Sequence, residues 1–159
     1  MPLQERHLVR KLIGISLLAV ALGACGSMTR PSPSIDLSGT WSGIVGSGSG
    51  GGRALRLTWT ASQTGNTVSG PATITTSPSV NDLTFPGTLT ALLSGTQLSL
   101  TYSAPSGSIA AAPQCSLSAR GTAASTSTAI SGQFDVTFLA CDLLGLQAPA
   151  SDQFTLTKP

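Results

Sequence analysis

From residue 37 onward, apolar residues recur at every second position, which is the period of a β-strand with one buried face. The clearest run is Ile130, Gly132, Phe134, Val136 and Phe138. Seven other segments alternate in the same way, with inner rows that start at Gly39, Leu55, Val68, Leu83, Leu98, Cys115 and Phe154. This region lacks the 3.6-residue period of an amphipathic helix. The pattern therefore predicts an all-β domain of about eight strands.

Short connections between consecutive rows favour an antiparallel meander. Its simplest closed form is a single up-and-down barrel, which leaves no sheet edge exposed. A two-sheet β-sandwich is the alternative. A barrel that spans a membrane is disfavoured, because the outward faces carry Ser, Thr, Gln, Asp and Arg where lipid needs apolar side chains. Pro71 lacks a backbone donor, which predicts a bulge or a sheet edge in its strand.

The N-terminus has the organisation of a secretory signal. Three basic residues precede the apolar run of residues 12–22, and small residues follow it. The run is shorter than the roughly 20 residues that a membrane-spanning helix needs. The motif Leu22-Gly23-Ala24-Cys25 resembles the lipobox of bacterial lipoproteins. That resemblance implies cleavage before Cys25 and attachment of acyl chains such as palmitate to its sulfur and its amine.

The predicted organisation is a signal peptide over 1–24, an acylated cysteine with a flexible tether over 25–36, and a barrel-like domain over 37–159. The protein is then exported and held at the membrane of the cell envelope by its lipid. Gly26 follows the anchor, and by the same resemblance this favours the outer membrane if the host is Gram-negative. Ordinary signal-peptide cleavage after Ala19-Val20-Ala21 is the alternative.

The part of the chain after Cys25 contains no histidine and no glutamate, and this excludes most kinds of catalytic site. His7 and Glu5 are the only His and Glu of the chain, and both lie in the signal peptide. A Ser-His-Asp or Cys-His arrangement and an imidazole metal site are therefore excluded. Five basic and five acidic residues balance each other, so no basic patch for nucleic acid is expected. We expect a non-enzymatic protein with no metal and no cofactor.

The run of residues 46–52 is rich in glycine, but it lacks the Lys-Ser/Thr and the following helix of a phosphate-binding loop. We interpret it as a flexible loop.

Cys115 and Cys141 remain once Cys25 is acylated, and an oxidising exported compartment favours a disulfide between them. Two free thiols are the alternative. A simple hairpin centred near Ser125, with its turn over 123–127, would place Cys115 opposite Asp135. Cys141 also has the outward parity of its strand. A bridge therefore requires a bulge or a loop that folds back.

The motif Gly39-x-Trp41 opens the first strand and is similar to the opening of lipocalins and of avidin-like barrels. The resemblance implies a tryptophan that closes one end of a barrel and stacks under a basic side chain. Arg120 or Lys158 could supply that cation. The chain lacks the Thr-Asp-Tyr motif and the terminal helix of lipocalins. An ordinary core aromatic is the alternative for Trp41.

Small inward residues, among them Gly70, Gly87 and Gly132, leave either a void or a narrow barrel. The residues that would line a void for a small apolar ligand or lipid are Trp41, Leu57, Trp59, Leu89, Tyr102 and Phe134. A filled barrel would leave a structural or interaction role in the envelope, which is the function we expect. The apolar-ligand carrier is the alternative, and an enzyme is least supported because general acid–base groups are scarce.

Overall fold

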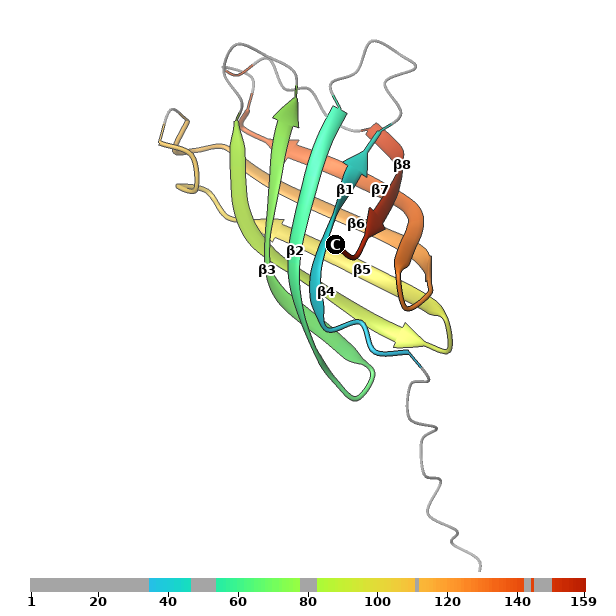
Figure 1. Cartoon of the computed structure of the whole chain (residues 1–159). Helices are drawn as coiled ribbons and strands as arrows, with labels where there is room; N and C mark the ends of the chain where they lie inside the picture. The colour runs from blue at the N-terminus through green and yellow to red at the C-terminus, as the bar shows by residue number, and fades with distance from the viewer. Residues whose placement is uncertain (1–34, 47–53, 78–82, 111, 142–143, 145–149) are drawn as a thin grey trace, which may run out of the picture. The chain divides into compact units, whose positions relative to one another are not determined.

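The computed structural model describes residues 35–46, 54–77, 83–110, 112–141, 144 and 150–159. The predicted signal peptide, Cys25 and most of the predicted tether lie outside these residues. Eight antiparallel strands form a closed barrel in which each strand pairs with the next and the last pairs with the first (Figure 1). They are β1 (Gly39–Val45), β2 (Ala54–Thr64), β3 (Thr67–Ser77), β4 (Thr84–Ser94), β5 (Gln97–Ala104), β6 (Ser116–Ser125), β7 (Ala129–Leu139) and β8 (Ala150–Thr157).

The pairing of β8 with β1 confirms the predicted up-and-down barrel and excludes the two-sheet alternative. The inward rows are those that the alternation predicts. Trp41, Trp59, Tyr102, Phe85 and Phe134 are among the largest side chains that are completely buried. Their burial removes apolar surface from water, which is the main force that holds such a barrel closed. Within the described residues, no helix is long and apolar enough to cross a membrane.

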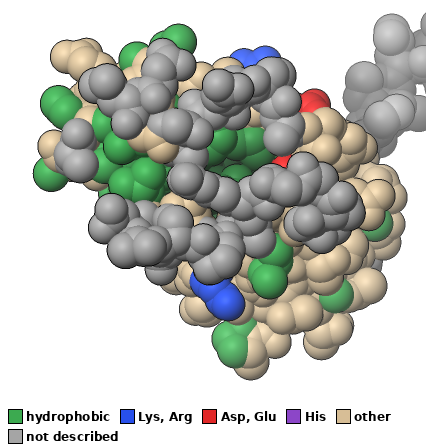
Figure 2. All heavy atoms as spheres, turned by 90° about the horizontal axis from the view of Figure 1, so that it is seen from above, with side chains coloured by type: hydrophobic (Ala, Val, Ile, Leu, Met, Phe, Trp, Pro, Cys, Tyr) green, Lys and Arg blue, Asp and Glu red, His purple; other side chains and the backbone are tan. Residues whose placement is uncertain are grey.

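The two ends of the barrel differ in their connections. Gly65-Asn66, Gly95-Thr96 and residues 126–128 make short turns at one end, which we call the tight-turn end. Strands β1, β3, β5 and β7 end at the other, which we call the loop end (Figure 1). The first residues of β1 and the last of β8 are both at the tight-turn end. Figure 2 views the loop end and shows apolar side chains between the parts that are drawn in grey.

Glycines mark the places where neighbouring strands approach most closely. A Cβ atom at Gly70 would lie 1.9 Å from the carbonyl oxygen of Thr60 on β2. At Gly132 it would lie 2.1 Å from the carbonyl oxygen of Thr122 on β6. Only glycine fits such contacts, which let the sheet bend sharply into a barrel. At these positions the small inward residue is required by the neighbouring backbone and leaves no space for a ligand.

The prediction of a bulge or an edge at Pro71 is wrong. Pro71 is exposed and lies opposite Thr88 of β4, and β3 has a neighbour on both sides. The pairing of β2 with β3 is interrupted opposite Thr60 and Ala61 but resumes in the same register. The missing donor of Pro71 therefore interrupts the ladder without adding a residue to it.

The predicted turn over 123–127 is also wrong. Strand β6 continues to Ser125, which pairs with Ile130, so the turn is three residues long and covers 126–128. The same register pairs Ser116 with Leu139, so Cys115 lies beside the end of β7 and not opposite Asp135. A run of small residues resembles a turn in sequence, yet here it continues the inward row with Ala123 buried.

Candidate functional site

The six residues predicted to line a ligand pocket all lie inside the barrel. Their exposed fractions are 0% for Trp41, Leu57, Trp59, Leu89 and Tyr102 and 1% for Phe134. Trp41 lies opposite Trp59 across β1 and β2, and Leu89 lies opposite Tyr102 across β4 and β5. A cavity that admits even one water molecule along these side chains would expose part of them. Other side chains therefore fill the space around all six.

Two polar groups stand out within this interior. The Tyr102 hydroxyl donates a hydrogen bond to the carbonyl oxygen of Phe85, and burial raises the pKa of Tyr102 to about 12. The indole Nε1 of Trp59 is buried and has no acceptor among the described residues. A buried donor without a partner costs about 1–3 kcal/mol. An additional molecule could satisfy this atom. The other buried side-chain atom without a partner among the described residues is Oγ of Ser108, in the connection between β5 and β6.

Trp41 closes the tight-turn end beneath a basic side chain, as its resemblance to lipocalins implies. The cation is Lys158, whose Nζ lies 5.4 Å from the centroid of the indole ring. Arg120 instead lies on the outer face of β6, opposite Asp135. Gly39 has φ of +124°, and a Cβ there would lie 2.7 Å from Cε of Lys158. The glycine of the Gly-x-Trp motif therefore leaves room for the lysine that covers the tryptophan.

Hydrogen bonds hold the segment before β1 across this end. The indole of Trp41 donates to the carbonyl oxygen of Leu37 at 2.8 Å. The Gln63 side chain accepts from the Leu37 amide at 2.7 Å and donates to the Ile35 carbonyl at 3.1 Å. The backbone amide and hydroxyl of Ser38 lower the pKa of Asp36 by hydrogen bonding to its carboxylate. The role of Gln63 was not predicted, because in sequence it belongs to a polar turn.

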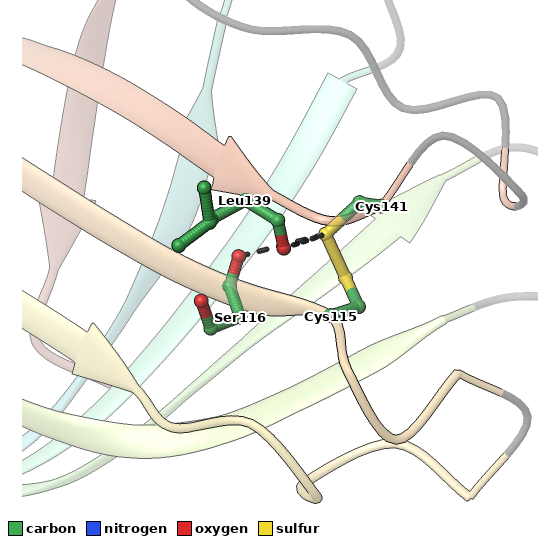
Figure 3. The surroundings of a disulfide bond; sticks show 4 residues. All are labelled: Cys115, Ser116, Leu139 and Cys141. Carbon is green, nitrogen blue, oxygen red and sulfur yellow. Dashed lines mark hydrogen bonds between the residues drawn. A yellow bond between two sulfur atoms is a disulfide. The ribbon is translucent and has the colours of Figure 1, made fainter.

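Cys115 and Cys141 form a disulfide at the loop end (Figure 3). Their Cα atoms are 4.7 Å apart. Ala140, with φ of +56° and an exposed side chain, breaks the alternation after β7. This conformation turns Cys141 from outward to inward, where it is 2% exposed. The sequence predicted that a disulfide needs a bulge or a loop that folds back. The structure meets this need with one residue in the left-handed region, Ala140.

The outer face carries one serine–carboxylate pair. The Ser151 hydroxyl donates to Oδ1 of Asp135 at 2.6 Å, and the Gln133 amide donates to the same hydroxyl. All three side chains are exposed and lie on β7 and β8. Asp142, the next acid along the chain, lies outside the described residues. A carboxylate alone can orient a serine hydroxyl. Without an imidazole to take its proton, the hydroxyl is not a nucleophile at neutral pH.

The closed meander of eight strands is consistent with a calycin-type barrel. No family model, curated protein or solved structure matches this chain. A function must therefore be argued from the geometry of its own residues.

A hollow of about 890 Å³ lies on the outside of the barrel over β1, β6, β7 and β8 and the first residue of β5. We call it the outer-wall hollow, and the residues that define it include Ser42, Gln97, Thr122, Ser131, Gln133 and Thr155. The hollow could not be predicted from the alternation of the sequence, which assigns these residues only to a solvated face. The concentration of Gln, Ser and Thr at outward positions of β7 and β8 is the only sequence signal that it has.

Proposed function

We propose that this chain is a lipid-anchored envelope protein whose barrel is a non-enzymatic structural or interaction module. The observation that carries the proposal is the burial of the six predicted pocket residues, of which none is more than 1% exposed. A carrier of apolar ligands generally needs a concave cavity of about 300 Å³ or more. An interior filled with side chains favours partners that bind the outer wall or the loop end.

The anchor in this proposal is Cys25, by resemblance of Leu22-Gly23-Ala24-Cys25 to the lipobox. Nine residues lie between Cys25 and Ile35, and the ten steps along the chain can span at most about 36 Å. Ile35 and the start of β1 are at the tight-turn end of the barrel. An anchored barrel would then keep this end nearer the membrane, with the loop end free to turn away from it. The opening Gly39-x-Trp41 and Lys158 over the indole support a distant relation to calycin-type barrels.

A carrier of a small ligand is the second candidate, and one observation favours it. The buried Nε1 of Trp59 lacks an acceptor among the described residues, and a ligand could provide one. Such a ligand would need the interior to open, because Trp59 is 0% exposed.

Tryptophan fluorescence distinguishes these two candidates. The chain has only two tryptophans, Trp41 and Trp59, and both are inside the barrel. Their emission therefore reports on the interior alone. We expect a brominated fatty acid, which quenches tryptophan on contact, to leave the emission of the purified protein unchanged. Saturable quenching at one molecule per chain would reject the structural role and support the carrier.

The mass of the mature N-terminus tests the anchor separately. The proposal requires cleavage before Cys25 and the added mass of its acyl chains. A mature chain that begins after Ala21 and carries no lipid would support ordinary secretion instead.

A further inference from the structure

The outer-wall hollow has a chemistry that selects a particular kind of ligand. Gln97, Gln133 and Gln153 contribute amides, and the other polar side chains of its lining are serine and threonine hydroxyls. None of its described lining residues is charged. Amides and hydroxyls both donate and accept hydrogen bonds, so they match a ligand that also does both. A charged ligand would lose water here without gaining a counter-charge.

The shape of the hollow is built into the sheet. Gly43 and Gly132 both line it, and at both positions the backbone of a neighbouring strand leaves no room for a side chain. A Cβ at Gly43 would be 1.8 Å from the carbonyl oxygen of Thr155. Because these approaches are fixed by backbone contacts, the surface exists before any ligand arrives. The hollow is open to solvent, so it suits an extended ligand that lies along it rather than one that it encloses.

The polar side chains are also partly oriented in advance. The hydroxyls of Ser131 and Thr155 lie 3.2 Å apart across β7 and β8, within hydrogen-bonding distance. The Gln133 amide is held by Ser151. Groups that are already ordered lose less entropy on binding than mobile ones. Neighbouring strands are about 4.8 Å apart, so polar groups recur across the hollow at intervals similar to the length of one sugar unit.

A protein strand is a poorer occupant than a sugar chain. Every strand of the closed barrel already has two neighbours, so no edge is left for an added strand. Recognition must come from side chains, and the exposed apolar ones in the lining are Ile44, at 50% exposure, and the small Ala124. The methyl groups of Ile44 can pack against the C–H face of a sugar ring.

We propose that the outer-wall hollow binds a neutral oligosaccharide chain through its amides and hydroxyls. The inference rests on the proposed function only in assuming that the barrel acts through its outside. We expect such a site to bind a single chain with a Kd of about 1 mM, because it is open to solvent and its contacts are spread over polar and apolar atoms in about equal parts.

Chemical-shift mapping of the purified, nitrogen-15-labelled full chain tests the proposal. The probes are maltohexaose and cellohexaose, with a polygalacturonate oligomer as the charged comparison. We expect at least one neutral probe to shift the amide signals of Ser131, Gln133 and Thr155. Thr155→Arg places a large cation in the hollow and should weaken binding at least about tenfold. Thr101→Arg, at an exposed position of β5 outside the hollow, is the matched control and should change the affinity less than about twofold.

Ser131→Arg provides a second blocking variant in case Thr155→Arg fails to fold. The inference is overturned if neither neutral probe shifts these signals at about 10 mM, ten times the expected Kd. Stronger binding of the charged oligomer would also overturn it. So would shifts that depend on protein concentration alone, since these indicate that a second copy of the chain occupies the hollow. None of these results affects the fluorescence test, so a failure here is distinct from a failure of the structural role.

Discussion

Replacing Gly70 by alanine tests whether the inward glycines serve the backbone or leave space for a ligand. The added Cβ would lie 1.9 Å from the carbonyl oxygen of Thr60, and contacts below 3.0 Å are essentially absent from proteins. Strand β2 would have to move by about 1 Å in a barrel that is closed on both sides, a strain of the kind that overpacked cores suffer. We expect Gly70→Ala to lower the free energy of unfolding by about 3 kcal/mol.

The assay is urea unfolding of the purified protein, followed by far-ultraviolet circular dichroism. Gly65→Ala is the matched control, because no atom lies within 4 Å of its added Cβ and only its φ of +59° is unfavourable. That strain costs about 1 kcal/mol. A Gly70→Ala protein as stable as the wild type, or more stable, would refute the reasoning. It would mean that the methyl group had entered open space and that the barrel is hollow beside β2.

Three further predictions concern the disulfide, the closed end and the buried phenol. The double variant Cys115→Ser, Cys141→Ser should have a free energy of unfolding about 3 kcal/mol lower, because the disulfide closes a loop across a sequence separation of 26. Urea unfolding measures this difference. Two titratable thiols from this pair in the unreduced wild type would contradict the disulfide. Lys158→Ala should lower the free energy of unfolding by about 1 kcal/mol and alter the near-ultraviolet circular dichroism of Trp41. Lys158→Arg should retain the stability and the spectrum of the wild type, because a cation stays over the ring. Equal effects of the two variants would argue against a cation–π contact. Tyr102 is the only tyrosine, so absorbance reports its titration directly, and its midpoint should lie near 12 and not near 10. The unfolded phenol loses its proton near pH 10 while the folded one keeps it, so stability should fall as the pH rises from 10 to about 12; a stability that is flat over this interval would contradict the burial of Tyr102.

The architecture could be predicted because alternation carries both the strand assignment and the direction of each side chain. The row from Ile130 to Phe138 needs no information beyond the period of two, and it faces inward as expected. The antiparallel order followed from short connections. Closure followed from the cost of an exposed edge. These are local or general properties, so they can be read from one chain.

The errors and gaps arose where the answer depends on a neighbouring strand. The sequence cannot show whether Gly70 faces a void or the Thr60 carbonyl, because that depends on the separation of β2 and β3. The predicted partner of Cys115 was wrong because Ala123, Ala124 and Ser125 have the composition of a turn but pair with β7. Their pairing moves the turn toward the C-terminus and changes the register of β6 against β7. The outer-wall hollow was missed for the same reason, since its side chains come from strands that meet only in the closed barrel.

Native mass spectrometry of the protein purified from its own membranes tests the central claim, that side chains fill the barrel and leave its outside to bind partners. The account predicts the mass of the polypeptide with its covalent acyl chains and no further bound molecule. A stoichiometric adduct with the mass of a fatty acid or another apolar molecule, lost on unfolding, would contradict it, because such a molecule does not match the amides and hydroxyls of the outer-wall hollow and would have to occupy the interior around Trp59.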